Sequence, residues 1–475
     1  MNEGMLKPKN IKPNERLSLY RTLFCLGMTI FIPSLGMSIV HVVLPTLVSK
    51  FDTTLSNANW VVISYLLSIT SLVLVGGVLG DRFGRKRLIL MGLGVFIFAS
   101  VFAALSLNIW TLIGARMVQG IGAAFLLSQS FALAGTALPK NKTGEAMGLL
   151  GTMAATGTAL GPLIGGLIVE WLNWPFIFWA MLPLSVVSYY FCNVFLPEDS
   201  EDKVDSKRLD LISMALLCTS LLCFTLFISS SASLSSQTNT GLLGVFALSL
   251  SLFINSQKDN EHAFIRLKLF RNTYRNTLLT ESFLVDATAM ATLVVGPFYL
   301  TYVTNLSPAN VGLVMAIGPF VGALSGYPAG RIVDYYGSGK ALIFGLCQIG
   351  LGVLCYAYFP LFFGVYGYIV ALFIMTPGRQ LFLAANSTYV INSVTNSEKG
   401  QASGLLNLSR NLGLMTGASV GGASFTLFLG TDVVSSATLE QLNTAYSMTF
   451  LIMFFLLMLS ILGIIYTKIR ERKYI

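Results

Sequence analysis

The sequence is poor in charged residues. Asp, Glu, Lys and Arg make up only 11% of its 475 residues, whereas 54% are hydrophobic. A soluble domain usually has about a quarter of its residues charged, so this composition excludes an ordinary soluble protein. It predicts an all-α polytopic membrane protein that lies in a lipid bilayer.

Histidine and cysteine are scarce as well. The two histidines, His41 and His262, have no neighbours that could complete a metal site. The six cysteines all lie in apolar segments without CxxC spacing, which is typical of small buried hydrophobic residues and not of a disulfide framework or a zinc site. An enzyme would also need clustered polar residues or a nucleophile with its base. We therefore expect no metal, no cofactor and no enzymatic activity.

A complete phosphate-binding loop is also missing. Segment 337–341 (GSGKA) resembles the end of such a loop, but Asp334 stands where the first glycine is needed and Ala341 where Ser or Thr is needed. Any transport would then be driven by an ion gradient or by the gradient of the substrate itself.

The sequence contains 14 apolar runs near the length that a bilayer requires, about 20 residues. Along the chain they form successive groups of six, two and six runs. They fall near residues 23–47, 59–80, 88–107, 110–135, 146–170, 176–197, 209–230, 241–256, 277–303, 309–332, 340–360, 363–390, 401–429 and 446–469. The sequence therefore predicts 14 transmembrane helices, arranged as two six-helix halves with two extra central helices.

These runs divide the chain into five parts. They are an N-terminal tail (1–22), an N-terminal half (23–197), a linker with two inserted helices (198–276), a C-terminal half (277–469) and a C-terminal tail (470–475). The first tail lacks a cleavable small-residue site, and the apolar run after it is too long for a signal-peptide core. We expect the N-terminus to be retained.

Lys and Arg residues gather in the loops on the N-terminal side, and Lys50 is the exception on the opposite side. Because basic loops stay in the cytoplasm, both termini are expected to be cytoplasmic, in a cell membrane. The net charge of +9 is then a topology signal, and no nucleic-acid partner is expected.

Two motifs occur twice. Segments 77–84 and 330–337 both read Gly, three residues, Asp, two residues, Gly, at an offset of 253 positions. Segments 157–166 and 413–422 both read GxxxGxxxGG, at an offset of 256. Two nearly equal offsets indicate an internal duplication, and parallel halves with a site between them near the membrane midplane are a known transporter architecture.

These motifs resemble those of the major facilitator superfamily. Segment 77–87 is similar to the family's loop between the second and third helices, and segment 112–124, with Arg116 and Gln119, resembles its fourth-helix motif. Segment 157–166 resembles the fifth-helix motif that goes with antiport. The layout of six, two and six resembles the fourteen-helix branch of drug:proton antiporters. The resemblance implies a transporter that works by alternating access on a small molecule and protons, and we expect a monomer.

The first motif predicts a gating loop. Its residues are Gly77, Asp81, Arg82, Gly84, Arg85 and, in the second copy, Asp334. Asp81 can face a helix N-terminus, and Arg85 can pair with a carboxylate, for which Glu145 is the nearest candidate. Such contacts would hold the outward-facing state, whereas the alternative is that the basic cluster only fixes the topology. Tyr335 and Ser338 replace two of the arginines in the second copy, so we expect a stronger latch in the N-terminal half.

The fifth-helix motif predicts close packing. Its residues are Gly157, Gly161, Pro162, Gly165 and Gly166. Glycines four apart share one helix face and form a smooth groove for a neighbouring helix, and the proline adds a kink. The functional interpretation is a leak-proof hinge between the halves, and the alternative is ordinary small-residue packing.

Few ionisable residues lie within the predicted spans, where they are costly and usually functional. Asp286 is the candidate for loading and releasing a proton, with a buried ion pair to an arginine as the alternative. Arg116 is expected to tune a proton site. Arg379 and Arg410, together with Glu281 at interfacial depth, are assigned to the substrate cavity. The alternative for either arginine is that it pairs with Asp286.

The first span departs from the family pattern. Gly36 and His41 stand where the family motif has Asp and Asn, so the carboxylate associated with cationic drugs is absent. His41 could take over the proton, because its ordinary pKa lies in the physiological range. The alternative is a hydrogen-bonded core histidine.

The sequence favours a proton-coupled exporter of small organic compounds or drugs. Three intramembrane arginines against two acids make the interior positive, which argues against a pump for lipophilic cations. A transporter of an endogenous anionic metabolite or siderophore is therefore an alternative, and a non-transporting membrane sensor is a more distant one.

Overall fold

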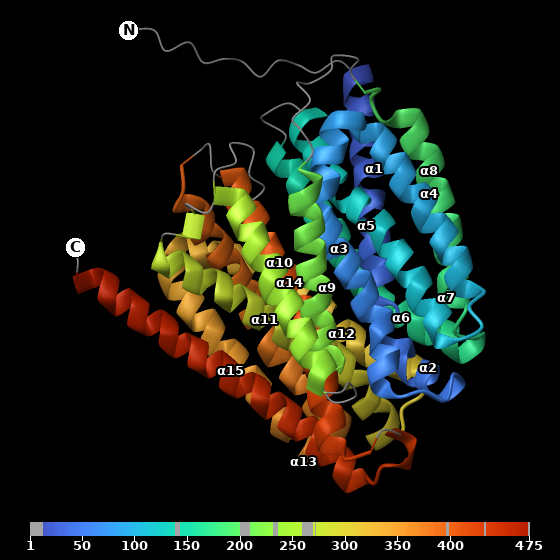
Figure 1. Cartoon of the computed structure of the whole chain (residues 1–475), viewed down its shortest axis with the longest axis vertical. Helices are drawn as coiled ribbons and strands as arrows, with labels where there is room; N and C mark the ends of the chain where they lie inside the picture. Colours follow the sequence, from blue (N-terminus) through green and yellow to red (C-terminus); the bar gives the residue numbers. More distant parts are fainter. Residues whose placement is uncertain are drawn as a thin grey trace.

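The computed structural model describes residues 13–137, 143–199, 210–230, 236–258, 269–270, 272–395, 399–431 and 434–473. These residues form helices joined by short turns (Figure 1). The elements are α1 (Pro13–Ser38), η1 (His41–Val43), α2 (Leu44–Lys50), α3 (Leu55–Phe83), α4 (Arg85–Ala104), α5 (Ile109–Ala137), α6 (Thr143–Trp171), α7 (Phe176–Trp179), α8 (Met181–Phe195), α9 (Leu211–Ser230), α10 (Ser236–Lys258), α11 (Thr273–Phe298), η3 (Tyr299–Val303), α12 (Pro308–Tyr336), α13 (Ser338–Asn392), α14 (Lys399–Leu429), η4 (Val434–Ser436) and α15 (Leu439–Lys473).

Twelve helical stretches in the described part of the chain are long and apolar enough to cross a membrane. This count does not confirm the 14 predicted helices. The spans predicted at 340–360 and 363–390 belong to one helix, α13, in which Gly364 leaves helical geometry (φ 55°, ψ −130°). The span predicted at 209–230 is α9, whose apolar part, Ile212–Ile228, is shorter than the others.

Polar residues in the turns fix where several helices begin. The side chain of Thr54 accepts a hydrogen bond from Asn57 N (3.2 Å) at the start of α3. Asn272 does the same for Arg275 N (2.7 Å) at the start of α11. Such caps satisfy backbone donors that have no partner inside the helix, so these turns set the register of the apolar faces that follow.

The two copies of the loop motif have the same backbone shape. Gly84 separates α3 from α4 with φ 99° and ψ 137°, and Gly337 separates α12 from α13 with φ 83° and ψ 150°. Positive φ is unfavourable for a residue with a β-carbon. Both turns therefore require glycine, as expected of a duplicated unit.

The halves, α1–α8 and α11–α15, converge at one end of the bundle. Figure 1 shows their helices meeting in the lower part of the view and spreading apart toward the upper end, where α1 begins. We call the lower end, which carries α2 and the start of α3, the far side. The halves pack there through α6 against α12 and α3 against α14, while α9 packs against both α3 and α14.

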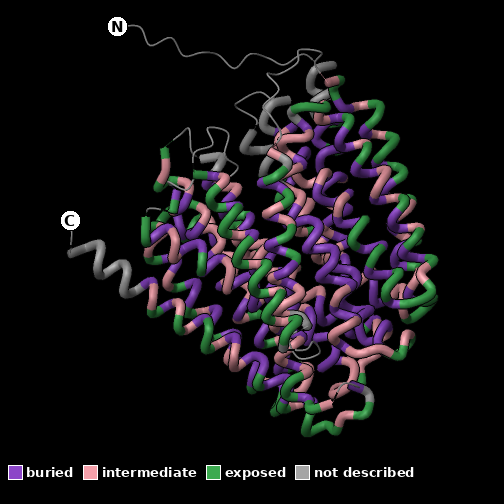
Figure 2. The backbone as a smooth tube through the Cα atoms, viewed as in Figure 1, coloured by how far each residue is buried: buried purple, intermediate pink, exposed green. Residues whose placement is uncertain are grey.

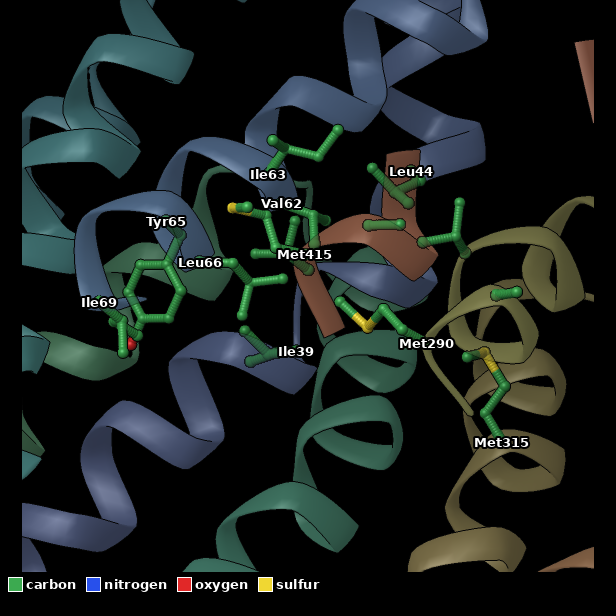
Figure 3. Close-up of a cluster of buried hydrophobic side chains, with 14 of the residues drawn as sticks. Ile39, Leu44, Val62, Ile63, Tyr65, Leu66, Ile69, Met290, Met315 and Met415 are labelled. Atoms are coloured by element: carbon green, nitrogen blue, oxygen red, sulfur yellow. The ribbon is translucent and has the colours of Figure 1, made fainter. Parts of the chain in front are cut away.

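Apolar side chains from both halves fill the space between them. Ile39 and Val62 of the N-terminal half, and Met290, Met315 and Met415 of the C-terminal half, belong to one buried cluster (Figure 3). Each of the five is at most 2% exposed. Methionine is flexible and fills irregular gaps, so this cluster could repack if the halves moved apart. Figure 2 shows the buried residues concentrated inside the halves and between them.

Candidate functional site

Asp286 forms ion pairs with two arginines. It lies near the middle of α11, and its side chain is 1% exposed. One carboxylate oxygen pairs with Nη2 of Arg379 on α13, and the other lies 3.3 Å from Nε of Arg410 on α14. A buried carboxylate needs such counter-ions. The ion pair that was the alternative interpretation of Asp286 is present, and its role in proton transfer stays a prediction.

The cluster carries one unit of excess positive charge, because one carboxylate faces two guanidinium groups. The side chains of Arg379 and Arg410 are 24% and 33% exposed. A charge that faces lipid would be costly, so we infer that their exposed parts border a space that water can reach. Nε of Arg379 is buried and has no hydrogen-bond partner in the described part of the chain.

Arg116 is held in the interior of the N-terminal half. It is fully buried on α5, and its guanidinium lies over the ring of Tyr65, 4.0 Å from the centroid. Nε donates to the carbonyl oxygen of Val61 (3.2 Å), and Nη1 donates to Oε1 of Gln119. Gln119 in turn donates to Ser100 Oγ (2.8 Å). The carbonyl, the amide and the ring thus stabilise the cation.

His41 begins η1 and is fully buried. Neither ring nitrogen has a hydrogen-bond partner in the described residues, so the hydrogen-bonded core histidine expected as the alternative is wrong for this conformation. The ring lies within electrostatic range of Arg116. Its part in proton coupling stays a prediction.

Glu281 lies on the same helix as Asp286 and is fully buried. Neither carboxylate oxygen has a hydrogen bond of normal geometry in the described residues, and Ser460 of α15 is its polar neighbour. The side chain is enclosed between helices, and its interfacial depth stays a prediction. Its place in a substrate cavity stays a prediction.

The gating loop is described in part. Gly77 has no neighbouring side chain within 4 Å of an added β-carbon, and Arg82 lies exposed over the ring of Phe83. Nη1 of Arg85 donates to the carbonyl oxygen of Ala132 on α5 (2.9 Å). The side chains of Asp81 and Glu145 lie outside the described residues, so their predicted contacts stay predictions. In the second copy, Asp334 is exposed.

The acid at the start of α4 is one that sequence reasoning missed. Asp199, which follows α8, accepts hydrogen bonds from the backbone N–H groups of Lys86 (2.9 Å) and Arg87 (3.1 Å). Glu198 pairs with Lys86 Nζ at 2.7 Å. Carboxylates stabilise helix N-termini, so the start of the predicted linker is fastened to the loop.

The fifth-helix glycines face a helix of their own half. A β-carbon on Gly157 would meet the backbone of α1 at Phe31 O (2.7 Å), and one on Gly161 or Gly165 would meet the backbone of Ile39, directly after α1, within 2.8 Å. In the second copy, a β-carbon on Gly413 would meet Phe283 O of α11 at 2.2 Å. The groove is therefore real, but its three glycines pack inside a half. The prediction that they form a hinge between the halves is wrong for these three.

Gly166 and Pro162 are the members of the motif that reach the other half. A β-carbon on Gly166 would meet Pro308 O of α12 at 2.4 Å, and one on Gly312 would meet Pro162 O at 2.3 Å. In the second copy, Gly422 faces Asn59 of α3. The close approach of helices between the halves thus depends on these positions.

The family follows from comparison with known sequences. A family model described as Major Facilitator Superfamily matches residues 26–418 and 278–474. The chain belongs to the Major Facilitator Superfamily. It is therefore a multi-pass membrane transporter and not an enzyme.

Relatives within the superfamily have different named substrates. The chain is 29% identical over 429 residues to the riboflavin transporter RibZ of Clostridioides difficile, covering 89% of this chain and 91% of that one. It is 28% identical over 430 residues to the multidrug resistance protein Stp of Mycobacterium tuberculosis, covering 88% and 77%. A crystal structure of a mutant of the nucleoside transporter NupG has the same fold, with a TM-score of 0.67 at 14% identity, over 94% of this chain and 99% of that one.

The superfamily motifs did not predict the hydrogen bonds that join the halves at the far side. Oε2 of Glu170, at the end of α6, accepts from Ala309 N at the start of α12 (2.8 Å). Nδ2 of Asn59 donates to the carbonyl oxygen of Ala418 (2.6 Å). The internal duplication could have indicated the second contact. Asn59 corresponds to Gly312 at the offset of 253, and Ala418 corresponds to Pro162 at the offset of 256, so the pair Asn59–Ala418 repeats the pair Gly312–Pro162.

Proposed function

We propose that this transporter exports small organic compounds in exchange for protons by alternating access. Asp286 carries the proposal, because it is a buried carboxylate near the middle of α11 whose two counter-ions are partly exposed. A proton on this carboxyl would weaken both ion pairs and loosen three helices of one half. Arg116 and His41 are proposed to form the corresponding group in the N-terminal half.

We also propose 14 transmembrane helices in all. A straight helix of 55 residues would extend about 80 Å, whereas the hydrocarbon core of a bilayer is about 30 Å thick. The break at Gly364 would let α13 cross twice, and α9 would cross between α3 and α14. An even number of crossings fits the proposal that both termini are cytoplasmic.

The described conformation is closed at the far side, where α6 packs against α12 and α3 against α14. If the termini are cytoplasmic, the far side faces outward and this conformation faces inward. The gating loop of segment 77–87 lies at the opposite end, and we propose that it closes when the far side opens.

The test is a proton-flux assay on purified protein in liposomes. A pH-sensitive dye inside would report proton movement on addition of each compound in a panel that includes riboflavin and cationic dyes. We expect at least one compound to drive protons in the opposite direction to its own movement, with loss of this coupling in Asp286→Asn. Glu440→Gln, at the exposed start of α15, is the matched control.

The proposal fails if no compound moves protons and Asp286→Asn is as active as the parent.

A further inference from the structure

We infer that Arg379 and Arg410 bind an anionic group of the substrate, such as a carboxylate, sulfonate or phosphate, and that Asp286 takes the place of this group when the site is empty. The inference goes beyond the proposed function. It rests on the proposed alternating access and proton coupling. It does not require that substrate and proton move in opposite directions.

Charge is the first argument. The cluster has two guanidinium groups and one carboxylate, so it carries one excess positive charge, and two when the carboxylate is protonated. A bound anion would lower this positive charge. A cationic group would instead add positive charge to a site that is already positive and would be repelled. Because electrostatic interactions are strong where water is largely excluded, the excess charge favours an anionic ligand.

Exposure is the second argument. The carboxylate of Asp286 is 1% exposed, whereas the arginines are 24% and 33% exposed. A ligand that enters from the water-accessible side would therefore meet the guanidinium groups before the carboxylate. Guanidinium groups can form paired hydrogen bonds with carboxylate and phosphate oxygens, and the unpartnered Nε of Arg379 is one donor that such a ligand could use.

Other charged groups do not replace Asp286 as the counter-ion. The helices packed against α11 include α12, α13, α14 and α15, together with α2 and η1. Apart from Arg379 and Arg410, the charged side chains described on them stand near helix ends: Lys50, Arg331, Asp334, Lys340 and Glu440. His41 in η1 and Glu281 on α11 itself are buried and form no ion pair within the described residues.

The arrangement has a consequence for coupling. A proton that enters from the water-accessible space and binds the Asp286 carboxylate would release both guanidinium groups for the substrate anion. When that proton leaves, the carboxylate would pair with the arginines again and expel the anion. Proton and anion therefore favour each other's binding. An acidic substrate would then move together with the proton, and for such substrates co-transport would replace the exchange proposed above. The described conformation, with both ion pairs formed, corresponds to the empty state.

Binding of two xanthene dyes of similar size tests the inference. Sulforhodamine B carries sulfonates, and rhodamine 6G is cationic, so neither charge titrates near neutral pH. We expect the protein in lipid nanodiscs to bind the sulfonated dye more tightly. Arg379→Gln and Arg410→Gln should each weaken binding of this dye about tenfold or more. Arg410→Lys should weaken it less. Lys340→Gln, at an exposed site, should leave the affinity unchanged.

Asp286→Asn gives the sharper result, because it imitates the protonated carboxyl. We expect it to tighten binding of the sulfonated dye severalfold and to remove the dependence of binding on pH. An Arg379→Gln variant that leaves Asp286 unpaired could fail to fold, so the same change is also made in the Asp286→Asn background, where no acid is left unpaired. The inference is overturned if the sulfonated dye does not bind, if Asp286→Asn weakens its binding, or if the arginine changes have no effect in that background.

Transport in liposomes separates this inference from the proposed function. If the arginine variants lose the sulfonated dye but no protons move with it, the anion site stands and proton coupling fails. If protons move against a cationic compound and the arginine variants transport it normally, proton coupling stands and the anion site is wrong. Uptake of the sulfonated dye that is accelerated by acid on the dye side supports both the site and co-transport.

Discussion

At the scale of single residues, the sequence identified the ionisable groups inside the membrane but not their partners. Rarity alone singled out Asp286 and the three arginines within the predicted spans, because charge within an apolar span is costly. Which arginine faces which acid depends on helix packing, and no local pattern encodes it. Arg379 and Arg410 meet Asp286, whereas Arg116 relies on Tyr65 and on backbone and amide oxygens.

Glu170 allows a prediction at this scale. Its carboxylate accepts from Ala309 N across the halves, and a negative charge at a helix N-terminus is stabilising. Glu170→Gln keeps an acceptor but loses the charge, so we expect the far side to open more often. A cysteine placed at Leu44, which is 1% exposed, should then react faster with an impermeant thiol reagent in a background that lacks the native cysteines.

The matched control is Glu440→Gln, which removes an exposed acid from the same side. Equal labelling rates in the two variants would show that the contact between Glu170 and α12 does not hold the far side closed.

At the scale of helices, glycines of one motif have two different roles. A β-carbon on Gly161 would meet Ser38 Oγ at 1.9 Å and Ile39 N at 2.8 Å inside the N-terminal half. Overpacking of this kind costs about 1–3 kcal/mol, so Gly161→Ala should lower the midpoint of thermal unfolding. Gly166→Ala should instead push α6 away from α12, which separating halves can relieve. We expect it to change labelling at the Leu44 position more than it changes thermal stability.

Gly151→Ala is the control on the same helix, because a β-carbon there has nothing within 4 Å. The two variants could instead show the same ratio between the change in the unfolding midpoint and the change in labelling rate at the Leu44 position. The distinction between Gly161, packed inside a half, and Gly166, packed between the halves, would then be wrong.

The helices also show what sequence can and cannot predict. Apolar runs predicted most of the helices, and the repeated glycines predicted that α6 and α14 pack closely, since spacing along a helix is a local property. The helix that each glycine faces is not local, so the sequence could not separate Gly165 from its neighbour Gly166. Asp199 was missed for the same reason, because its partners at the start of α4 lie more than 100 positions earlier.

At the scale of the whole molecule, the halves meet at the far side through packed helices, α6 against α12 and α3 against α14. Close-packed glycines, a few hydrogen bonds such as the cap from Glu170 to Ala309 N, and an apolar cluster containing Met290, Met315 and Met415 join them there. None of these contacts is a buried ion pair between the halves in the described residues. The surface can therefore part without leaving an unpaired charge in the interior, as a rocking motion requires.

Locking this surface should stop transport. Ser49 Oγ and Tyr302 OH lie 3.2 Å apart across the halves at the far side. Cysteines at both positions, joined by a short bifunctional thiol reagent, would hold the far side closed while leaving the Asp286 cluster untouched. We expect the cross-linked protein to lose transport in liposomes and the unlinked double variant to keep it. Each single variant treated with the reagent should stay active, because the reagent then bridges nothing. Transport that survives complete cross-linking would mean that the substrate passes without opening the far side, and alternating access between these two halves would be excluded.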